Sequence, residues 1–219
     1  RVHLEEDTGK LTHVTRDGES YSLVDLNRAG ISLLEIVSEP DMHTVEEVRA
    51  YADVLRAIVR YLGVNSGDME KGVIRFEANV SVRPVGSQTL GTRVEIKNLN
   101  SFRALERSVA YQIEEQIAAL ERGESVVQQT LGWDESAGKT FSQRSKEEAH
   151  DYRYFPEPDL PPLVVEPEWA QAVAASLPEL PRAKRARFQA EFGLTPYEAR
   201  LLAEDQAVAR YFERAAAAG

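Results

Sequence analysis

Val-Ile-Arg-Phe-Glu-Ala-Asn-Val-Ser-Val-Arg, residues 73–83, alternates apolar and polar side chains from Ile74 onward. An apolar side chain at every second position is the period of a β-strand that has one face in a core. The same period returns in residues 92–98, Thr-Arg-Val-Glu-Ile-Lys-Asn, where Val94 and Ile96 alternate with charged residues. The two stretches therefore predict neighbouring strands that share one apolar face and one polar face.

The predicted polar face carries both kinds of charge. Arginine and lysine suit phosphate oxygens, whereas carboxylates together with an amide suit a hard cation such as Mg²⁺. A polar face is also what a half-buried sheet presents to water, and the pattern alone favours such a solvated surface. The side chains concerned are Arg75, Glu77, Asn79, Arg93, Glu95 and Lys97.

Bulk composition excludes several classes of protein. With 28% charged and 42% hydrophobic residues the 219-residue chain is typical of a globular protein, and no apolar run approaches the roughly 18 residues that cross a bilayer. The absence of cysteine excludes disulfides, cysteine-bound zinc and thiol catalysis. We therefore expect no membrane association and a cytoplasmic setting. The chain starts at Arg1 without a signal segment, and we interpret it as a fragment.

The charge balance argues against a general nucleic-acid binder. The chain has 26 Lys and Arg against 36 Asp and Glu, a formal net charge of −10. A protein that grips a phosphate backbone carries a basic face instead. Any contact with nucleic acid is expected to be local.

The order of predicted elements indicates an α+β fold built on a largely antiparallel sheet with long helices. One helix starts at the capping box Thr44-Val-Glu-Glu47 and stops at Gly63, and a second covers residues 101–122 and stops at Gly123. Residues 1–37 indicate a meander of short strands separated by turns. The predicted strands cover residues 2–6, 11–14, 21–26, 31–37, 73–83, 92–98, 126–133 and 140–143.

Beyond Pro156 the composition changes. Eight of the ten prolines lie between Pro156 and Pro196, and alanine-rich segments there predict a group of helices. We place a domain boundary near residue 177, with one domain over residues 1–176 and the beginning of a helical domain over residues 177–219. The helical segments are expected at 168–176, 182–192 and 196–217.

Of three local motifs, two leave alternatives open and one is rejected. The acids in residues 3–10 repel one another and suit a cation, but an acidic turn in water explains them equally well. Strict alternation puts Glu6 on one strand face and Glu5 on the other, so the pattern does not decide which of them faces a site. Residues 132–140 imitate a phosphate loop but have five residues between the glycines where that motif has four, and we reject it. Residues 151–159, rich in aromatic and charged side chains, suit either the border of a binding site or a structural clamp.

Six stretches, taken in order, resemble the B subunits of the bacterial aspartyl/glutamyl-tRNA amidotransferases. The resemblance implies a glutamine-synthetase-like cradle followed by a helical domain, in a heterotrimer with an amidase subunit and a small third subunit. It implies that ATP and Mg²⁺ are used to phosphorylate the side-chain carboxylate of Glu on tRNA(Gln) or Asp on tRNA(Asn). Ammonia released from glutamine then displaces the phosphate. The stretches are residues 3–10, 22–30, 34–41, 75–79, 95–102 and 151–159.

The resemblance also implies roles for the charged residues. Glu6, Glu77 and Glu95 are expected to be catalytic and to hold the metal, with Glu5 as an alternative ligand. ATP, phosphate or the acyl carboxylate is expected to contact Arg75, Arg93, Lys97 and Asn79.

The chain departs from the family in two ways. Position 77 is Glu, where relatives commonly carry Asp. The preceding strands and the tail domain that helps to bind misacylated tRNA are missing, so we expect the isolated chain to be inactive. The competing hypothesis is a non-catalytic acidic α+β scaffold that docks a partner protein of the same complex.

Overall fold

The computed structural model describes residues 1–7, 9–142 and 163–218. Contacts divide the chain into two units, Arg1–His43 and Thr44–Gly219. The domain boundary that the sequence predicts between residues 176 and 177 is a different division and stays a prediction.

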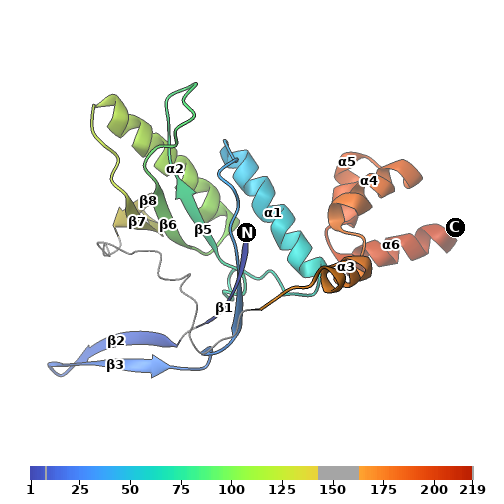
Figure 1. Cartoon of the computed structure of the whole chain (residues 1–219), viewed down its shortest axis with the longest axis horizontal. Coiled ribbons are helices and arrows are strands. Elements are labelled where there is room, and N and C mark those ends of the chain that lie inside the picture. Colours follow the sequence, from blue (N-terminus) through green and yellow to red (C-terminus); the bar gives the residue numbers. More distant parts are fainter. Residues whose placement is uncertain (8, 143–162, 219) are drawn as a thin grey trace. The chain divides into compact units, whose positions relative to one another are not determined.

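The described residues of the first unit form four strands in two antiparallel ladders, in which β1 pairs with β4 and β2 pairs with β3 (Figure 1). This nested order differs from the predicted meander, where each strand pairs with the next. The backbone N–H of Asp7 donates to the carbonyl of Ile31, and that of Gly30 donates to the carbonyl of Asp7, which holds the end of β1 against the start of β4. The strands are β1 Val2–Glu6, β2 Lys10–Arg16, β3 Glu19–Asp25 and β4 Ser32–Ile36.

The second unit contains a four-stranded sheet in the order β5-β6-β7-β8. The β6–β7 pair is parallel and the other two pairs are antiparallel. Helix α2, Phe102–Glu121, connects the two parallel strands (Figure 1). The α+β prediction is thus confirmed at the level of fold class. The strands are β5 Phe76–Val80, β6 Val94–Leu99, β7 Gln129–Asp134 and β8 Lys139–Ser142.

Both long helices begin where the sequence predicts. Helix α1, Val45–Tyr61, starts at the capping box, in which the Glu47 N–H donates to Thr44 Oγ1 at 3.1 Å and the Thr44 N–H donates back to Glu47 Oε2 at 3.2 Å. Helix α2 is capped by Ser101 Oγ, which accepts from the N–H of Ala104. The core forms between these helices and one face of the sheet. Its buried members are Ala52, Val80, Ile96, Leu99, Ala104, Leu105, Val109 and Trp133.

The C-terminal helices are α3 Pro167–Ser176, α4 Pro181–Phe192, α5 Pro196–Leu202 and α6 Gln206–Ala218. The predicted helical segment 196–217 is interrupted because Asp205 starts a new helix, its Oδ1 accepting from the N–H groups of Ala207 and Val208. A separate small core forms around Phe188. None of the helices in the described part of the chain is long and apolar enough to cross a membrane.

Candidate functional site

A β-bulge shapes the polar face of the four-stranded sheet. Phe76 pairs with Leu99 and Ala78 pairs with Ile96, so two residues of β6 lie opposite Glu77 alone. The second of them, Asn98, has a φ of 62°, the left-handed conformation that asparagine tolerates better than most residues. Bulges of this kind redirect a side chain and are common beside active sites. Here the bulge lies at Lys97 and Asn98.

Four side chains of neighbouring strands meet on this face, and we call them the polar-face cluster: Glu77, Glu95, Lys97 and Thr130. Lys97 Nζ lies 3.2 Å from Glu77 Oε2 and 3.5 Å from Glu95 Oε1. Thr130 Oγ1 donates a hydrogen bond of 2.8 Å to Glu95 Oε2. The Glu95 side chain is 20% exposed and that of Glu77 is 44% exposed. The cluster thus holds one half-buried and one accessible carboxylate around a single ammonium group.

The remaining predicted residues of the sheet are distributed unevenly. Asn79 is the cross-strand partner of Glu95 and so shares its face. Arg75 comes directly before β5 and Arg93 directly before β6, and the two strands are antiparallel. The two arginines therefore flank opposite ends of the ladder. The predicted common face is confirmed for the two glutamates, Lys97 and Asn79, but the structure does not gather both guanidinium groups at one point.

The N-terminal acids occupy both faces of the β1–β4 ladder. Glu6 pairs with Ser32 and lies on the face of the exposed Leu4, whereas Glu5 lies on the opposite face with His3. These residues belong to the first unit, so no distance to the polar-face cluster follows, and the metal role assigned to Glu6, with Glu5 as alternative, stays a prediction.

The donor set of the cluster fits part of a magnesium site. Mg²⁺ is commonly held by one or two carboxylates, with substrate phosphates and water completing its six oxygen ligands. Glu77 and Glu95 supply two such carboxylates, and Lys97 stands between them. Within the described residues no group of three or more His, Asp or Glu side chains is arranged to hold a metal ion. A complete protein cage is therefore not present in that part of the chain.

Two carboxylates with lowered pKa values, Glu135 and Glu179, belong to ion pairs elsewhere in the second unit. Hydrogen bonds from Trp133 Nε1 and from Arg107 hold the pKa of Glu135 below its usual value. The guanidinium of Arg187, with Lys184, lowers the pKa of Glu179 to about 2. These ion pairs fasten helices to neighbouring elements and indicate a structural role.

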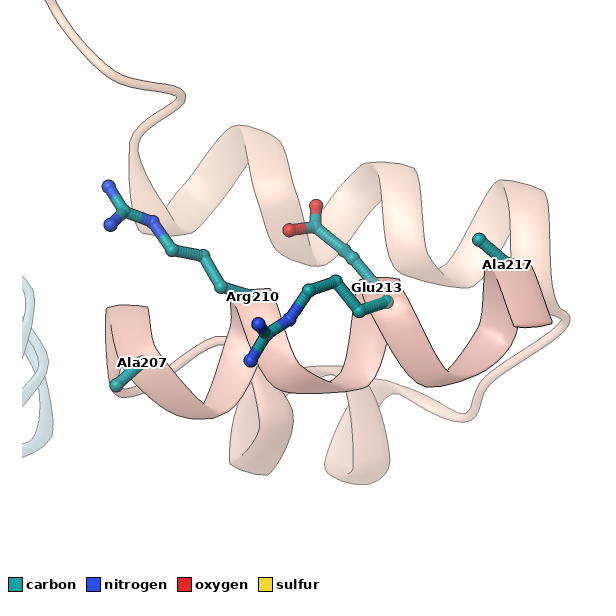
Figure 2. Close-up of a pocket in the computed structure, with 5 residues that line it drawn as sticks. Ala207, Arg210, Glu213 and Ala217 are labelled. Atoms are coloured by element: carbon teal, nitrogen blue, oxygen red, sulfur yellow. The ribbon is translucent and has the colours of Figure 1, made fainter.

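An open hollow of about 600 Å³ runs along α6 (Figure 2). Its one carboxylate, Glu213, is engaged by Lys184 Nζ at 2.9 Å and by Arg187 of α4. The hollow therefore offers two arginines and an alanine surface, and its acid is already paired. It is lined by Ala207, Arg210, Glu213, Arg214 and Ala217.

Thr130 is the member of the cluster that sequence reasoning missed. The available signal was alternation, because Leu131 and Trp133 are buried on the helix side and Thr130 therefore points to the other face. Its partner Glu95 lies 35 positions earlier in the chain, and the register of a parallel pair cannot be read from a local pattern. The predicted motif of residues 151–159 lies outside the described residues.

Residues 1–171 match the GatB/GatE catalytic domain family. The chain belongs to this family. It is 58% identical over 218 residues to the B subunit of the aspartyl/glutamyl-tRNA(Asn/Gln) amidotransferase of Roseiflexus sp. (strain RS-1), covering all of this chain and 44% of the relative. The protein of the same name from Herpetosiphon aurantiacus is 58% identical over 213 residues, 97% of this chain and 44% of the relative.

A third relative of that name, from Picosynechococcus sp. (strain ATCC 27264 / PCC 7002 / PR-6), is 54% identical over 222 residues, covering all of this chain and 45% of the relative. The chain thus spans slightly less than half the length of these relatives. The resemblance drawn from the sequence stretches is confirmed at the level of the family.

Proposed function

We propose that this chain is part of the B subunit of a tRNA-dependent amidotransferase, a ligase that serves protein synthesis. The observation that carries the proposal is 58% identity along 218 residues to a protein of that name. The geometry of the polar-face cluster supports it, because carboxylates beside a lysine suit the handling of phosphate. The scaffold alternative is not favoured, since the family is described as a catalytic domain.

The proposed reaction has two steps. The γ-phosphoryl group of ATP passes to the side-chain carboxylate of Glu on tRNA(Gln) or Asp on tRNA(Asn), giving an acyl phosphate and ADP. Ammonia then attacks the acyl carbon, phosphate leaves, and the amide remains. In phosphoryl transfer the protein mainly positions the reacting groups and stabilises the negative charge of the transition state. Little covalent chemistry is required of its side chains.

The residues of this chain have distinct parts in that step. Lys97 offers an ammonium to a phosphate oxygen or to the acyl carboxylate, and it is held in place by Glu77 and Glu95 at 3.2 and 3.5 Å. Asn79 offers an amide beside Glu95, and Arg75 and Arg93 offer guanidinium groups at the two ends of the ladder. Mg²⁺, when bound, would neutralise charge on the phosphates, and Glu77 and Glu95 are the residues of the cluster that we assign to it.

The rest of the machinery lies outside this chain in the proposal. An amidase subunit supplies ammonia from glutamine, and a small third subunit completes the heterotrimer. Misacylated tRNA binds mainly through other regions, in agreement with the net charge of −10. A glutamine-synthetase-like cradle in the cytoplasm is part of the same proposal, and the isolated chain is expected to be inactive.

The substitution Glu95→Gln tests the proposed function. It keeps the shape of the side chain and removes its negative charge, so ATP-dependent activation should fall by at least about 100-fold in the heterotrimer reconstituted with the full-length protein. ADP formation and transamidation are measured with both misacylated tRNAs. Glu114→Gln, on the exposed side of α2, is the matched control and should keep the parental rates. Parental rates in Glu95→Gln, or a parent complex without ATP-dependent transamidation, contradict the proposal.

A further inference from the structure

Thr130 and Glu95 face each other across two strands of the sheet. The parallel β6–β7 register makes the two residues direct partners, and Thr130 Oγ1 donates to Glu95 Oε2 at 2.8 Å. A hydrogen bond whose acceptor is ionised is stronger than one between neutral groups. The contact therefore acts on the carboxylate of Glu95 directly.

The two oxygens of this carboxylate have different partners. Oε2 accepts from Thr130, while Oε1 lies 3.5 Å from Lys97 Nζ. Two contacts on opposite oxygens fix the orientation of the carboxylate plane, which one contact alone leaves free to rotate. Glu77, more exposed, meets the same ammonium at 3.2 Å. Glu95 is thus the better fixed of the two acids.

Threonine is well suited to anchor this carboxylate. Its branched Cβ restricts rotation about χ1, so the hydroxyl has few directions available. Thr130 pairs with Glu95 of β6, and the next residue, Leu131, is paired with strands on both sides and is 5% exposed in the core. The backbone that carries the hydroxyl is therefore rigid, which is the condition for holding a reactive group in a defined geometry.

We infer that Thr130 is a positioning residue that holds Oε2 of Glu95, so that Oε1 faces Lys97 and the reacting groups. The inference rests on the proposed function, because acyl activation is the step in which Glu95 acts. Thr130 itself contacts neither phosphate nor acyl group in this assignment. It works through Glu95, and its effect should vanish when Glu95 can no longer act as a carboxylate.

Thr140 on the adjacent strand provides a matched control. Its Oγ1 accepts a hydrogen bond of 2.8 Å from Gln112 of α2, so it lies on the helix side of the sheet. Thr130→Val and Thr140→Val each keep a branched side chain and remove one hydrogen-bonded hydroxyl. The third variant, Thr130→Ser, keeps the hydroxyl and removes a methyl group.

The heterotrimer with the full-length protein is assayed for ATP-dependent activation of the acyl group. In Thr130→Val we expect kcat to fall by about 10- to 100-fold, the usual effect of losing a group that orients a ligating side chain, with KM for misacylated tRNA within about twofold. Thr130→Ser should recover most of the loss, and Thr140→Val should keep the parental kcat. Parental kcat in Thr130→Val, or an equal loss in both valine variants, overturns the inference.

A double-mutant cycle separates positioning from a general effect on the sheet. When Thr130→Val is added to Glu95→Gln, the residual single-turnover rate should change by less than about twofold, because residues that act as one unit are not additive. A further loss as large as the one in the parent means that Thr130 acts on something else, and that result contradicts the inference.

The hydrogen bond between Thr130 and Glu95 is also tested by NMR, in a measurement that needs no catalytic turnover. In the full-length protein labelled with ¹³C at the glutamate δ carbon, the Glu95 signal is assigned by its absence in Glu95→Gln. We expect this signal to shift in Thr130→Val and to stay in place in Thr140→Val. A Glu95 signal that does not move in Thr130→Val overturns the inference. An inactive parent complex instead overturns the proposed function, so the two failures are distinguishable.

Discussion

Neighbouring residues of β6 lie on opposite faces of the sheet, one in the core and the other in the polar-face cluster. Ile96 is fully buried among α1, α2 and the sheet, whereas the polar-face cluster lies on the other side of the same strand. Ile96→Ala should lower the free energy of unfolding by about 2–5 kcal/mol, because it leaves a cavity that the core fills only partly. Glu77→Gln on the adjacent strand should stay within about 1 kcal/mol of the parent.

The measurement is urea unfolding followed by the fluorescence of Trp133, in a Trp169→Phe background. Trp133 is buried in the same core, while Trp169 is 53% exposed and reports poorly on it. If Glu77→Gln lowers the free energy of unfolding as much as Ile96→Ala does, the assignment of the two faces is wrong.

The alternation of apolar and polar residues predicts which face of the sheet a side chain lies on, but not how deeply it is buried. The sequence pattern predicts Phe76, Val80 and Val82 in the core, but Val80 alone of the three is buried, at 7% exposed, and the other two are half-buried. Strand β5 is an edge strand and ends at Val80, so its flanking side chains receive less cover. The bulge at Asn98 is likewise invisible in the pattern, since it depends on a positive φ that the tertiary structure imposes.

A side chain of α2 completes the end of strand β5. Gln116 Nε2 donates to the carbonyl of Val80 at 3.1 Å, and its Oε1 accepts from the N–H of Val82 at 3.2 Å. The amide thus takes the place of a further strand where the ladder ends. Gln116 is 4% exposed, so water cannot easily replace it.

Gln116→Leu should therefore destabilise the fold by roughly 2–4 kcal/mol, because it leaves a carbonyl and an N–H without partners in a poorly hydrated place. Glu115→Leu, one residue earlier and exposed, should change the free energy of unfolding by less than about 0.5 kcal/mol. Urea midpoints of the two variants decide the question, and similar midpoints contradict a strand-completing role for Gln116.

The ends of helices are easier to predict from the sequence than the pairing of strands. Thr44, Ser101 and the glycines after both long helices are local signals, and the structure confirms the helices that they delimit. Pairing of β1 with β4, and of β6 with β7 across a 20-residue helix, joins residues far apart in the sequence. Local periodicity contains no information on such partners, which is why the meander was wrong and Thr130 was missed.

At the scale of the whole chain, helix α1 is fastened to the C-terminal helices by two polar contacts. Tyr61 Oη donates to the carbonyl of Ala203 at 2.5 Å, and Arg60 Nη2 lies 2.9 Å from Asp205 Oδ2. Tyr61 is 4% exposed and Ala203 is fully buried. The alanine-rich composition of this region predicts helices, but it does not reveal that they dock on α1 through a tyrosine.

This docking should depend on pH in the alkaline range. Burial, with the charge of Asp205 as a smaller cause, raises the pKa of Tyr61 from its ordinary value of 10.0 to about 12. A pKa raised in the folded state means that the neutral phenol is favoured by folding. Its contribution is complete below about pH 10 and is lost as the pH rises to about 12. A difference of this size between the folded and unfolded pKa corresponds to roughly 2–3 kcal/mol of unfolding free energy.

Tyr61→Phe should remove this dependence. At pH 7 the variant should be less stable by about 1–3 kcal/mol, because the buried carbonyl of Ala203 loses its partner. Between about pH 9 and 11 it should lose less stability than the parent, since no phenol ionises at this contact. Tyr197→Phe is the control: Tyr197 is 66% exposed, and its removal should leave the parental alkaline loss in place. Urea unfolding at about pH 7, 9, 10 and 11 tests all three chains, and a full parental loss in Tyr61→Phe shows that another group causes the alkaline transition.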